Sequence, residues 1–173
     1  MTELNEGRLR FSFPGFVQVF KYDELKFYEN QFQKVSNSTK AVDFVCADDN
    51  TLYLIEVKDY SQHPRTKPTE LPEEIALKVR DTLAGLFACA ANANDLDERR
   101  YASECLKTVR NGGQFRIILH LEQARTRSRL KPQLFNPMNL ELKLKKQLKA
   151  IDPHPRVVSR QMLGQFPWDV SVG

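Results

Sequence analysis

The segment 40–60, KAVDFVCADDNTLYLIEVKDY, constrains the fold of this chain more than any other part of it. Two apolar runs flank Asp48-Asp49-Asn50, the arrangement of an antiparallel β-hairpin. If Asp49 and Asn50 form a two-residue turn, the register places Asp43 directly opposite Glu56. Both carboxylates then project from the same face of the hairpin.

Side chains alternate between the two faces of a β-strand, so the hairpin can be divided into two sets. The face that carries the two carboxylates holds Ala41, Asp43, Val45, Leu52, Leu54, Glu56 and Lys58. The other face holds Phe44, Cys46, Tyr53, Ile55 and Val57. Because both sets are largely apolar, we expect the strands to be central in a sheet that is covered on both sides.

Hydrophobic periodicity predicts further elements on either side of the hairpin. We expect strands at about 16–22, 115–121 and 156–159, helices over 73–91, from Asp95 to about 109 and from Pro137 to about 151, and a docked tail at 166–168. Asp95 and Glu98 match a capping box at the start of the second helix, with Asp95 as the N-cap. Segment 23–35 fits either a helix or a strand. These elements predict an α/β fold with a central mixed β-sheet flanked by helices. We expect one domain over 1–173, with a motif core at about 16–121 and a basic loop and helix over 122–173.

The chemistry of the hairpin follows from its buried charges. Burying two facing carboxylates is costly, because each loses its hydration and the two repel one another. Lys58 supplies one positive charge from the same face, which leaves the pocket net negative. A divalent ion that prefers oxygen ligands, Mg²⁺ or Mn²⁺, would complete it.

Asp43 on one strand, followed by Glu56-Val57-Lys58 on the next, resembles the signature of the PD-(D/E)XK nuclease superfamily. The resemblance implies a restriction-endonuclease-like fold and Mg²⁺-dependent hydrolysis of phosphodiester bonds. It also implies that Asp43, Glu56 and the backbone carbonyl of Val57 bind the metal, and that Lys58 is the catalytic lysine. Members of this family often use a further N-terminal acid, for which we choose Glu29 over Asp23 and Glu24.

Other interpretations of the same residues remain open. Asp43 and Lys58 can form an ion pair at a strand end, with Glu56 solvated at a sheet edge. The chain can also be a nuclease-like domain without activity that binds nucleic acid or protein, or a metal-independent partner in a larger complex. Glu-x-Lys alone does not decide, since it also occurs at Glu24 and Glu141.

Positive charge is concentrated toward the end of the chain. Residues 1–106 carry 13 basic and 18 acidic side chains, whereas 107–173 carry 13 basic and 4 acidic ones. We expect a nucleic-acid partner, DNA first and RNA second, bound by phosphate contacts. The candidate contacts are Arg125, Arg127, Arg129, Lys131, Lys78 and Arg80. Lys78 can alternatively neutralise Glu74 four residues earlier, and the lysines at 143–149 can extend the surface.

Composition excludes several other classes of protein. Three widely spaced cysteines indicate neither a disulfide framework nor a CxxC metal site. The chain shows no secretory h-region and no apolar run long enough to cross a bilayer, so we expect a cytoplasmic location without membrane insertion. A homodimer remains open. His120 ends an apolar stretch and is better explained as a sheet histidine than as a ligand.

Overall fold

The computed structural model describes residues 1–63, 65–124 and 135–173. The strands are β1 (Thr2–Glu6), β2 (Leu9–Phe13), β3 (Gln18–Lys21), β4 (Phe44–Ala47), β5 (Thr51–Tyr60), β6 (Gln114–Gln123), β7 (Arg156–Val158) and β8 (Asp169–Val172). The helices are α1 (Lys26–Asn30), α2 (Leu71–Asn92), α3 (Leu96–Arg110) and α4 (Pro137–Leu148), with 3-10 turns η1 (Tyr22–Glu24), η2 (Phe32–Asn37) and η3 (Arg160–Met162).

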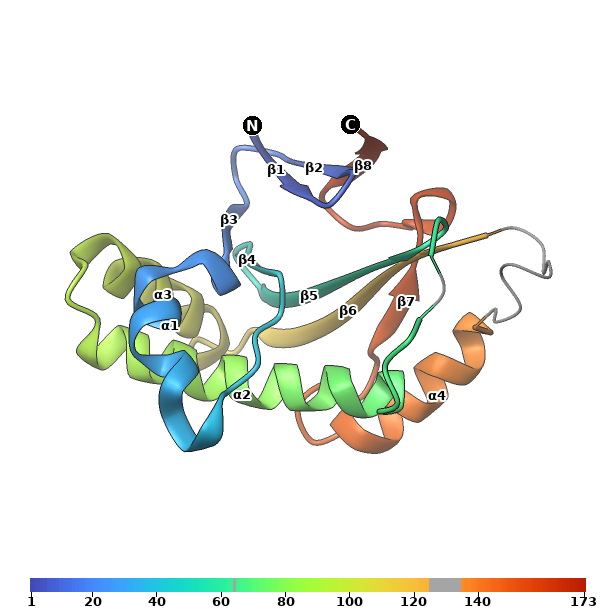
Figure 1. Ribbon diagram of the computed structural model, residues 1–173. Helices are drawn as coiled ribbons and strands as arrows, with labels where there is room; N and C mark the ends of the chain where they lie inside the picture. The colour runs from blue at the N-terminus through green and yellow to red at the C-terminus, as the bar shows by residue number, and fades with distance from the viewer. Residues whose placement is uncertain (64, 125–134) are drawn as a thin grey trace.

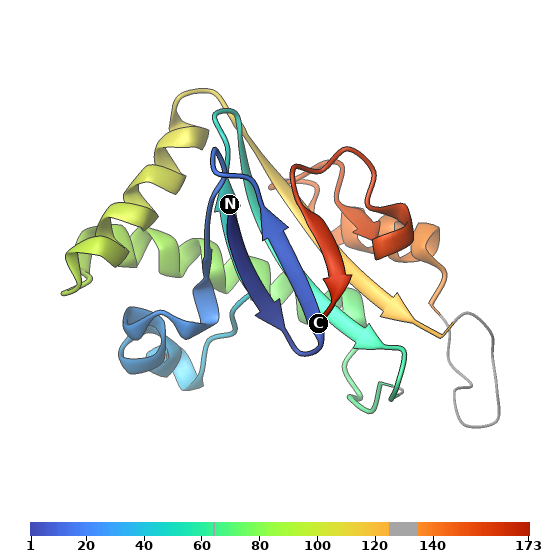
Figure 2. The same ribbon diagram turned by 90° about the horizontal axis from the view of Figure 1, so that it is seen from above.

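A five-stranded sheet in the order β3-β4-β5-β6-β7 forms the centre of the molecule. Strands β3, β4 and β5 are antiparallel, while β5, β6 and β7 are parallel, so the sheet is mixed. Helices α2 and α4 lie along one face, and a small sheet, β1-β2-β8, lies over the other (Figure 1). Seen from above, the small sheet crosses over the long strands β5 and β6 (Figure 2). The predicted α/β fold with a central mixed sheet is confirmed.

The hairpin forms in the predicted register. Phe44 pairs with Ile55 and Ala47 with Leu52, and Asp48 closes the turn by accepting hydrogen bonds from the amides of Asn50 and Thr51. β5 lies between β4 and β6, so it is a central strand as expected. Its two faces contact different parts of the core.

The two faces of the sheet bury different kinds of side chain. The face toward α2 packs aliphatic residues such as Leu52, Leu54 and Ile75. The opposite face packs the aromatic residues Phe11 and Phe44 with other apolar side chains against the small sheet. Trp168 is buried in this second cluster, so the expected docking of the tail is confirmed. The tail continues into β8, which pairs with β2.

The helices begin and end close to the predicted residues. Asp95 caps α3 by accepting hydrogen bonds from the amides of Asp97 and Glu98, as expected for an N-cap. The second half of the predicted capping box is wrong, because Glu98 turns toward α1 and accepts hydrogen bonds from the amides of Lys26 and Phe27. Glu98 thus satisfies free donors at the start of α1 instead. Segment 23–35, which fitted either state, contains no strand and consists mostly of short helical turns, with an extended backbone at Leu25 and Val35.

No helix in the described ranges is both long enough and apolar enough to cross a bilayer.

Candidate active site

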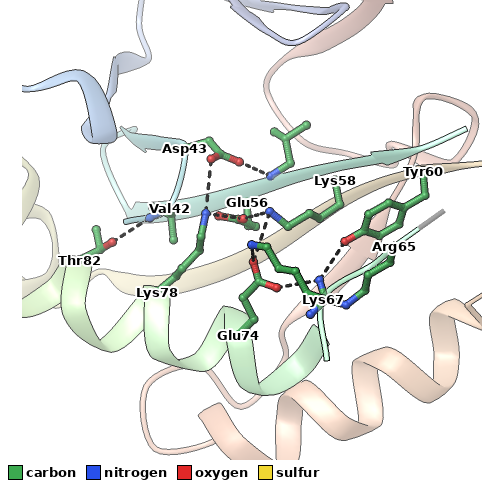
Figure 3. Close-up of polar contacts among 11 residues, drawn as sticks. Val42, Asp43, Glu56, Lys58, Tyr60, Arg65, Lys67, Glu74, Lys78 and Thr82 are labelled. Atoms are coloured by element: carbon green, nitrogen blue, oxygen red, sulfur yellow. Dashed lines mark hydrogen bonds and ion pairs between the residues drawn. The ribbon is translucent and has the colours of Figure 1, made fainter. Parts of the chain in front are cut away.

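Asp43 lies directly before β4 and is held by the backbone on both sides. Its Oδ2 accepts a hydrogen bond of 2.6 Å from the amide of Val57, and its own carbonyl accepts one of 3.1 Å from the amide of Tyr22. The side chain is buried and points toward Lys78 on α2 (Figure 3). Its position is therefore fixed by two neighbouring segments and not by its own flexibility. We call the buried cluster of Asp43, Glu56, Lys58 and Lys78 the pocket.

Glu56 projects from the middle of β5 and is almost fully buried, with 1% of its surface exposed. Its Oε1 contacts Nζ of Lys58 and lies 2.6 Å from Nζ of Lys78. Its Oε2 is buried and accepts no hydrogen bond within the described part of the chain. The alternative in which Glu56 is solvated at a sheet edge is therefore wrong.

Burial raises the pKa of Glu56 to about 7, and the nearby charge of Asp43 adds to this shift. The two ammonium groups of Lys78 and Lys58 oppose the shift without cancelling it. A carboxyl that titrates near neutral pH in a buried charge cluster is a marker of functional sites, although structural clusters share it.

Lys78 comes from α2 and belongs to the pocket. This corrects the expectation that Lys78 can neutralise Glu74 and the expectation that the pocket is net negative. Its Nζ also lies 3.7 Å from Oδ1 of Asp43, so it does not neutralise Glu74. With Lys58 and Lys78 both present, two positive charges face two negative ones. The net negative excess expected from the sequence is therefore absent, because the sequence could not show that a helix adds a second ammonium group.

Lys58 is buried to a large extent and stays charged. Burial alone would lower its pKa, but the negative charges of Glu56, Asp43 and Glu74 outweigh burial and raise the pKa above its usual value. A permanently protonated amine can hold a negative group or stabilise developing charge. It cannot act as a general base, which limits the roles open to this lysine.

A second charged cluster adjoins the first and was not predicted. Glu74, in the first turns of α2, lies 2.7 Å from Arg65 and 2.6 Å from Lys67. Its distance to Nζ of Lys58 is 3.8 Å. Burial would raise its pKa, but hydrogen bonds from Lys67 and Arg65 and the charge of Lys58 lower it to about 2. Lys58 thus connects the two clusters (Figure 3).

Of the acids in the N-terminal segment, Asp23 and not Glu29 interacts with Asp43. Glu29 is exposed on α1. Burial and the nearby charge of Asp43 together raise the pKa of Asp23 to about 6, which indicates that the two carboxylates are close. The η1 turn that positions Asp23 leaves no periodic signal in the sequence.

The pocket offers two carboxylate oxygens to a cation. Oε2 of Glu56 is without a hydrogen-bond donor in the described part of the chain, and Oδ1 of Asp43 lies 3.7 Å from the nearest ammonium, too far for a hydrogen bond. Within residues 1–63, 65–124 and 135–173, no three side chains of His, Cys, Asp or Glu form a metal-binding group. Mg²⁺ is commonly bound by one or two carboxylates with water in its remaining positions, so the two acids fit it.

The remaining candidates lie elsewhere. Arg80 is on the exposed side of α2 and pairs with Asp81 at 2.9 Å. His120 is fully buried on the opposite face of the sheet, where it meets Glu122 at 3.2 Å and packs against Phe11. This agrees with the sheet-histidine interpretation. The predicted phosphate contacts Arg125, Arg127, Arg129 and Lys131 lie outside the described residues.

Comparison with known proteins gives one finding that bears on function. The chain is similar to a cysteine–tRNA ligase of Neisseria meningitidis serogroup A, at 29% identity over 214 aligned residues. The similarity covers 100% of this chain but 30% of the relative, so the chain spans less than a third of that protein's length. No known family matches the chain, and no solved structure matches it.

Proposed function

We propose that this chain is a metal-dependent nuclease domain with a restriction-endonuclease-like fold, which hydrolyses phosphodiester bonds in nucleic acid. One observation carries the proposal: Asp43, directly before β4, and Glu56 on β5 are both buried, and their carboxylates lie 3.7 Å and 2.6 Å from the ammonium group of Lys78. The order of elements supports it, since an antiparallel hairpin is followed by two helices, α2 and α3, and then by the parallel strand β6. Both features agree with the motif resemblance in the sequence.

Asp43 and Glu56 would hold Mg²⁺ or Mn²⁺, together with the backbone carbonyl of Val57. The metal would polarise a phosphoryl oxygen and lower the pKa of a bound water. The cation would bind Oε2 of Glu56, which has no hydrogen-bond donor in the described part of the chain, and its charge would repel the ammonium group of Lys78. Lys78 can then move toward a substrate phosphate, since it is attached to α2 by a long flexible stem.

Lys58 would act as a fixed positive charge in this reaction. Its retained proton suits it to orient the attacking water and to stabilise negative charge on the phosphoryl group. Glu74 would keep the ammonium group in place, because it lies on the side of Lys58 away from Asp43 (Figure 3). Proton removal from water would have to come from the carboxylate side of the pocket.

For the substrate we place RNA before DNA, reversing the order expected from the sequence. The protein to which this chain is similar, a cysteine–tRNA ligase, has an RNA in its name.

A second candidate function is a nuclease-like domain without catalysis that binds nucleic acid or protein. It is favoured by the charge balance of the pocket: Lys78 already lies 2.6 Å from Glu56 and occupies the place where a metal would bring its charge. If that ammonium stays in place, the carboxylates need no metal.

Metal titration followed by thermal unfolding separates the two candidates. For a nuclease, Mg²⁺ or Mn²⁺ should stabilise the chain by about 2.7 kcal/mol at roughly a hundred times the Kd. Asp43→Asn should abolish this shift, and Asp49→Asn, a matched change in the exposed turn, should not. A shift that appears only in Lys78→Met would favour the inactive domain. Equal shifts in wild type and Asp43→Asn would reject the metal site.

Cleavage assays test the catalytic lysine. Lys58→Met should lower the rate of RNA cleavage about 100-fold or more, as expected for loss of a preorganised charge. Metal affinity should stay the same or rise, because a positive charge has left the pocket. Lys107→Met, at an exposed position of α3, is the control and should cleave normally. A fully active Lys58→Met would reject this mechanism.

A further inference from the structure

Helix α4 presents an exposed basic groove that the proposed active site does not use. The groove has a volume of about 910 Å³, and its lining includes Phe135, Leu142, Lys143, Lys145, Lys146 and Lys149. We call it the α4 groove. It lies on the same side of the sheet as α2 (Figure 1).

The lysines of the α4 groove are largely free to bind an anion. Lys143 is paired with Glu70 at 3.2 Å, and the one acid of the helix, Glu141, is paired with Arg156. Lys145, Lys146 and Lys149 are exposed, and no ion pair involves them in the described part of the chain. The groove therefore carries three uncompensated positive charges.

Apolar surface lies beside these charges. Leu142 is 65% exposed, an unusual position for a leucine on a lysine-rich helix face. Phe135 is half-buried at the start of the groove, and its ring lies 5.7 Å from the ring of Tyr60. A groove that offers both apolar contacts and ammonium groups fits a ligand with both flat rings and phosphates.

The α4 groove is connected to the proposed active site. Tyr60 is the last residue of β5 and follows Lys58 by two positions, so both side chains lie on the face toward α2. The phenol oxygen of Tyr60 lies 3.3 Å from Arg65, which binds Glu74. A strand lying in the groove and passing Phe135 and Tyr60 would therefore be led toward Lys58.

We propose that the α4 groove binds an unpaired stretch of RNA, with phosphates on Lys145, Lys146 and Lys149 and a base against Leu142 or Phe135. The choice of RNA rests on the proposed function. An unpaired stretch is required because a duplex keeps its bases stacked inside and offers nothing to the apolar side chains. Phosphate contacts alone would not use Leu142.

Fluorescence anisotropy of a labelled single-stranded RNA, with the full chain in EDTA to prevent cleavage, tests this site. Replacing Lys145, Lys146 and Lys149 together by Ser should weaken binding at least tenfold at low salt. It should make the slope of log K against log[salt] shallower by about 2, at roughly 0.7 per lost phosphate contact. Leu142→Ser should weaken binding severalfold with an unchanged slope.

The control removes the same charge elsewhere, by changing Lys34, Lys107 and Arg110 to Ser, and should leave the slope unchanged. Equal losses in the two triple variants would overturn the site, because the effect would be one of net charge. Duplex RNA bound as well as single-stranded RNA would overturn the role of unpaired bases, and equally tight binding of single-stranded DNA would overturn the assignment to RNA.

Failure of this proposal can be told apart from failure of the nuclease proposal. Asp43→Asn should bind RNA in EDTA as wild type does, since the groove does not include Asp43. Loss of cleavage with intact groove binding would count against the reaction alone. Intact cleavage of RNA, with a salt slope that the lysine variant does not change, would count against the groove alone.

Discussion

Two glutamates on the α2 side of the central sheet, Glu56 and Glu74, each have 1% of their surface exposed, but their pKa values are shifted in opposite directions. Burial raises the pKa of Glu56 to about 7, whereas three cations hold that of Glu74 at about 2. Glu56 shares its ammonium groups with a second carboxylate, Asp43. Glu74 is contacted by Arg65, Lys67 and Lys58, and of these three cations only Lys58 also contacts a second acid, Glu56, in the described part of the chain.

The difference indicates two roles for neighbouring charge clusters. An acid with an excess of cations stabilises the folded chain and ties the loop after β5 to α2. An acid beside another acid is costly to ionise, and it gains from any cation that arrives. We therefore propose a structural role for the Glu74 cluster and place the proposed chemistry at Asp43 and Glu56.

The largest effect is expected for Glu74→Gln. Removing the charge leaves the buried guanidinium of Arg65 without its ion-pair partner, which should cost about 3 to 5 kcal/mol of unfolding free energy at pH 7. Because the folded pKa is lowered, this advantage of wild type is present above the unfolded pKa of 4.5 and is lost as pH falls toward 2. Urea unfolding at several pH values measures it.

Glu73→Gln is the matched control, since Glu73 directly precedes Glu74 in α2 and is exposed. It should change stability by less than about 0.5 kcal/mol. A comparably small effect of Glu74→Gln would show that the cluster is not structural, and the contrast with Glu56 would disappear.

Glu56 should give the opposite pH dependence. Its folded pKa of about 7 lies above its ordinary value of 4.5, so the folded state binds the extra proton between these values. Stability should therefore fall as pH rises from about 4.5 through 7, by about 3 kcal/mol for this group. With EDTA present in all samples, this fall in unfolding free energy with pH should be missing in Glu56→Gln and retained in Glu29→Gln. An equal dependence of stability on pH in wild type and Glu56→Gln would mean that Glu56 is not the carboxyl with the raised pKa.

The hairpin part of this comparison could be predicted from the sequence. A two-residue turn and strict alternation of side chains fix which residues of a hairpin face each other. The sequence alone therefore predicts that Asp43, Glu56 and Lys58 lie on one face of the hairpin. The same local reasoning predicted α2 and the N-cap at Asp95. Each of these rests on spacing along the chain within one element or one turn.

The helix part could not be predicted, because it depends on how α2 is rotated over the sheet. Glu74 and Lys78 are four residues apart, a spacing that predicts an ion pair along the helix. In the fold, β5 offers a buried carboxylate within reach of Lys78, and the loop after β5 offers Arg65 to Glu74. Strands β1 and β8 were missed for a related reason: they are short and largely exposed, so pairing with β2 and not hydrophobic pattern defines them.

The smallest effect is expected within the Glu74 cluster itself, at Lys67. Lys67 is 61% exposed, whereas only 5% of the Arg65 side chain is exposed, although both contact Glu74 at nearly the same distance. An exposed ion pair is worth less than about 1 kcal/mol, since water screens it and a long side chain must be ordered. Lys67→Met should therefore cost little, while Arg65→Met should cost about 1 to 3 kcal/mol through the unpaired charge left on Glu74. Urea unfolding at pH 7 measures both, and a larger loss for Lys67→Met would show that the exposed cation, and not the buried one, keeps Glu74 ionised.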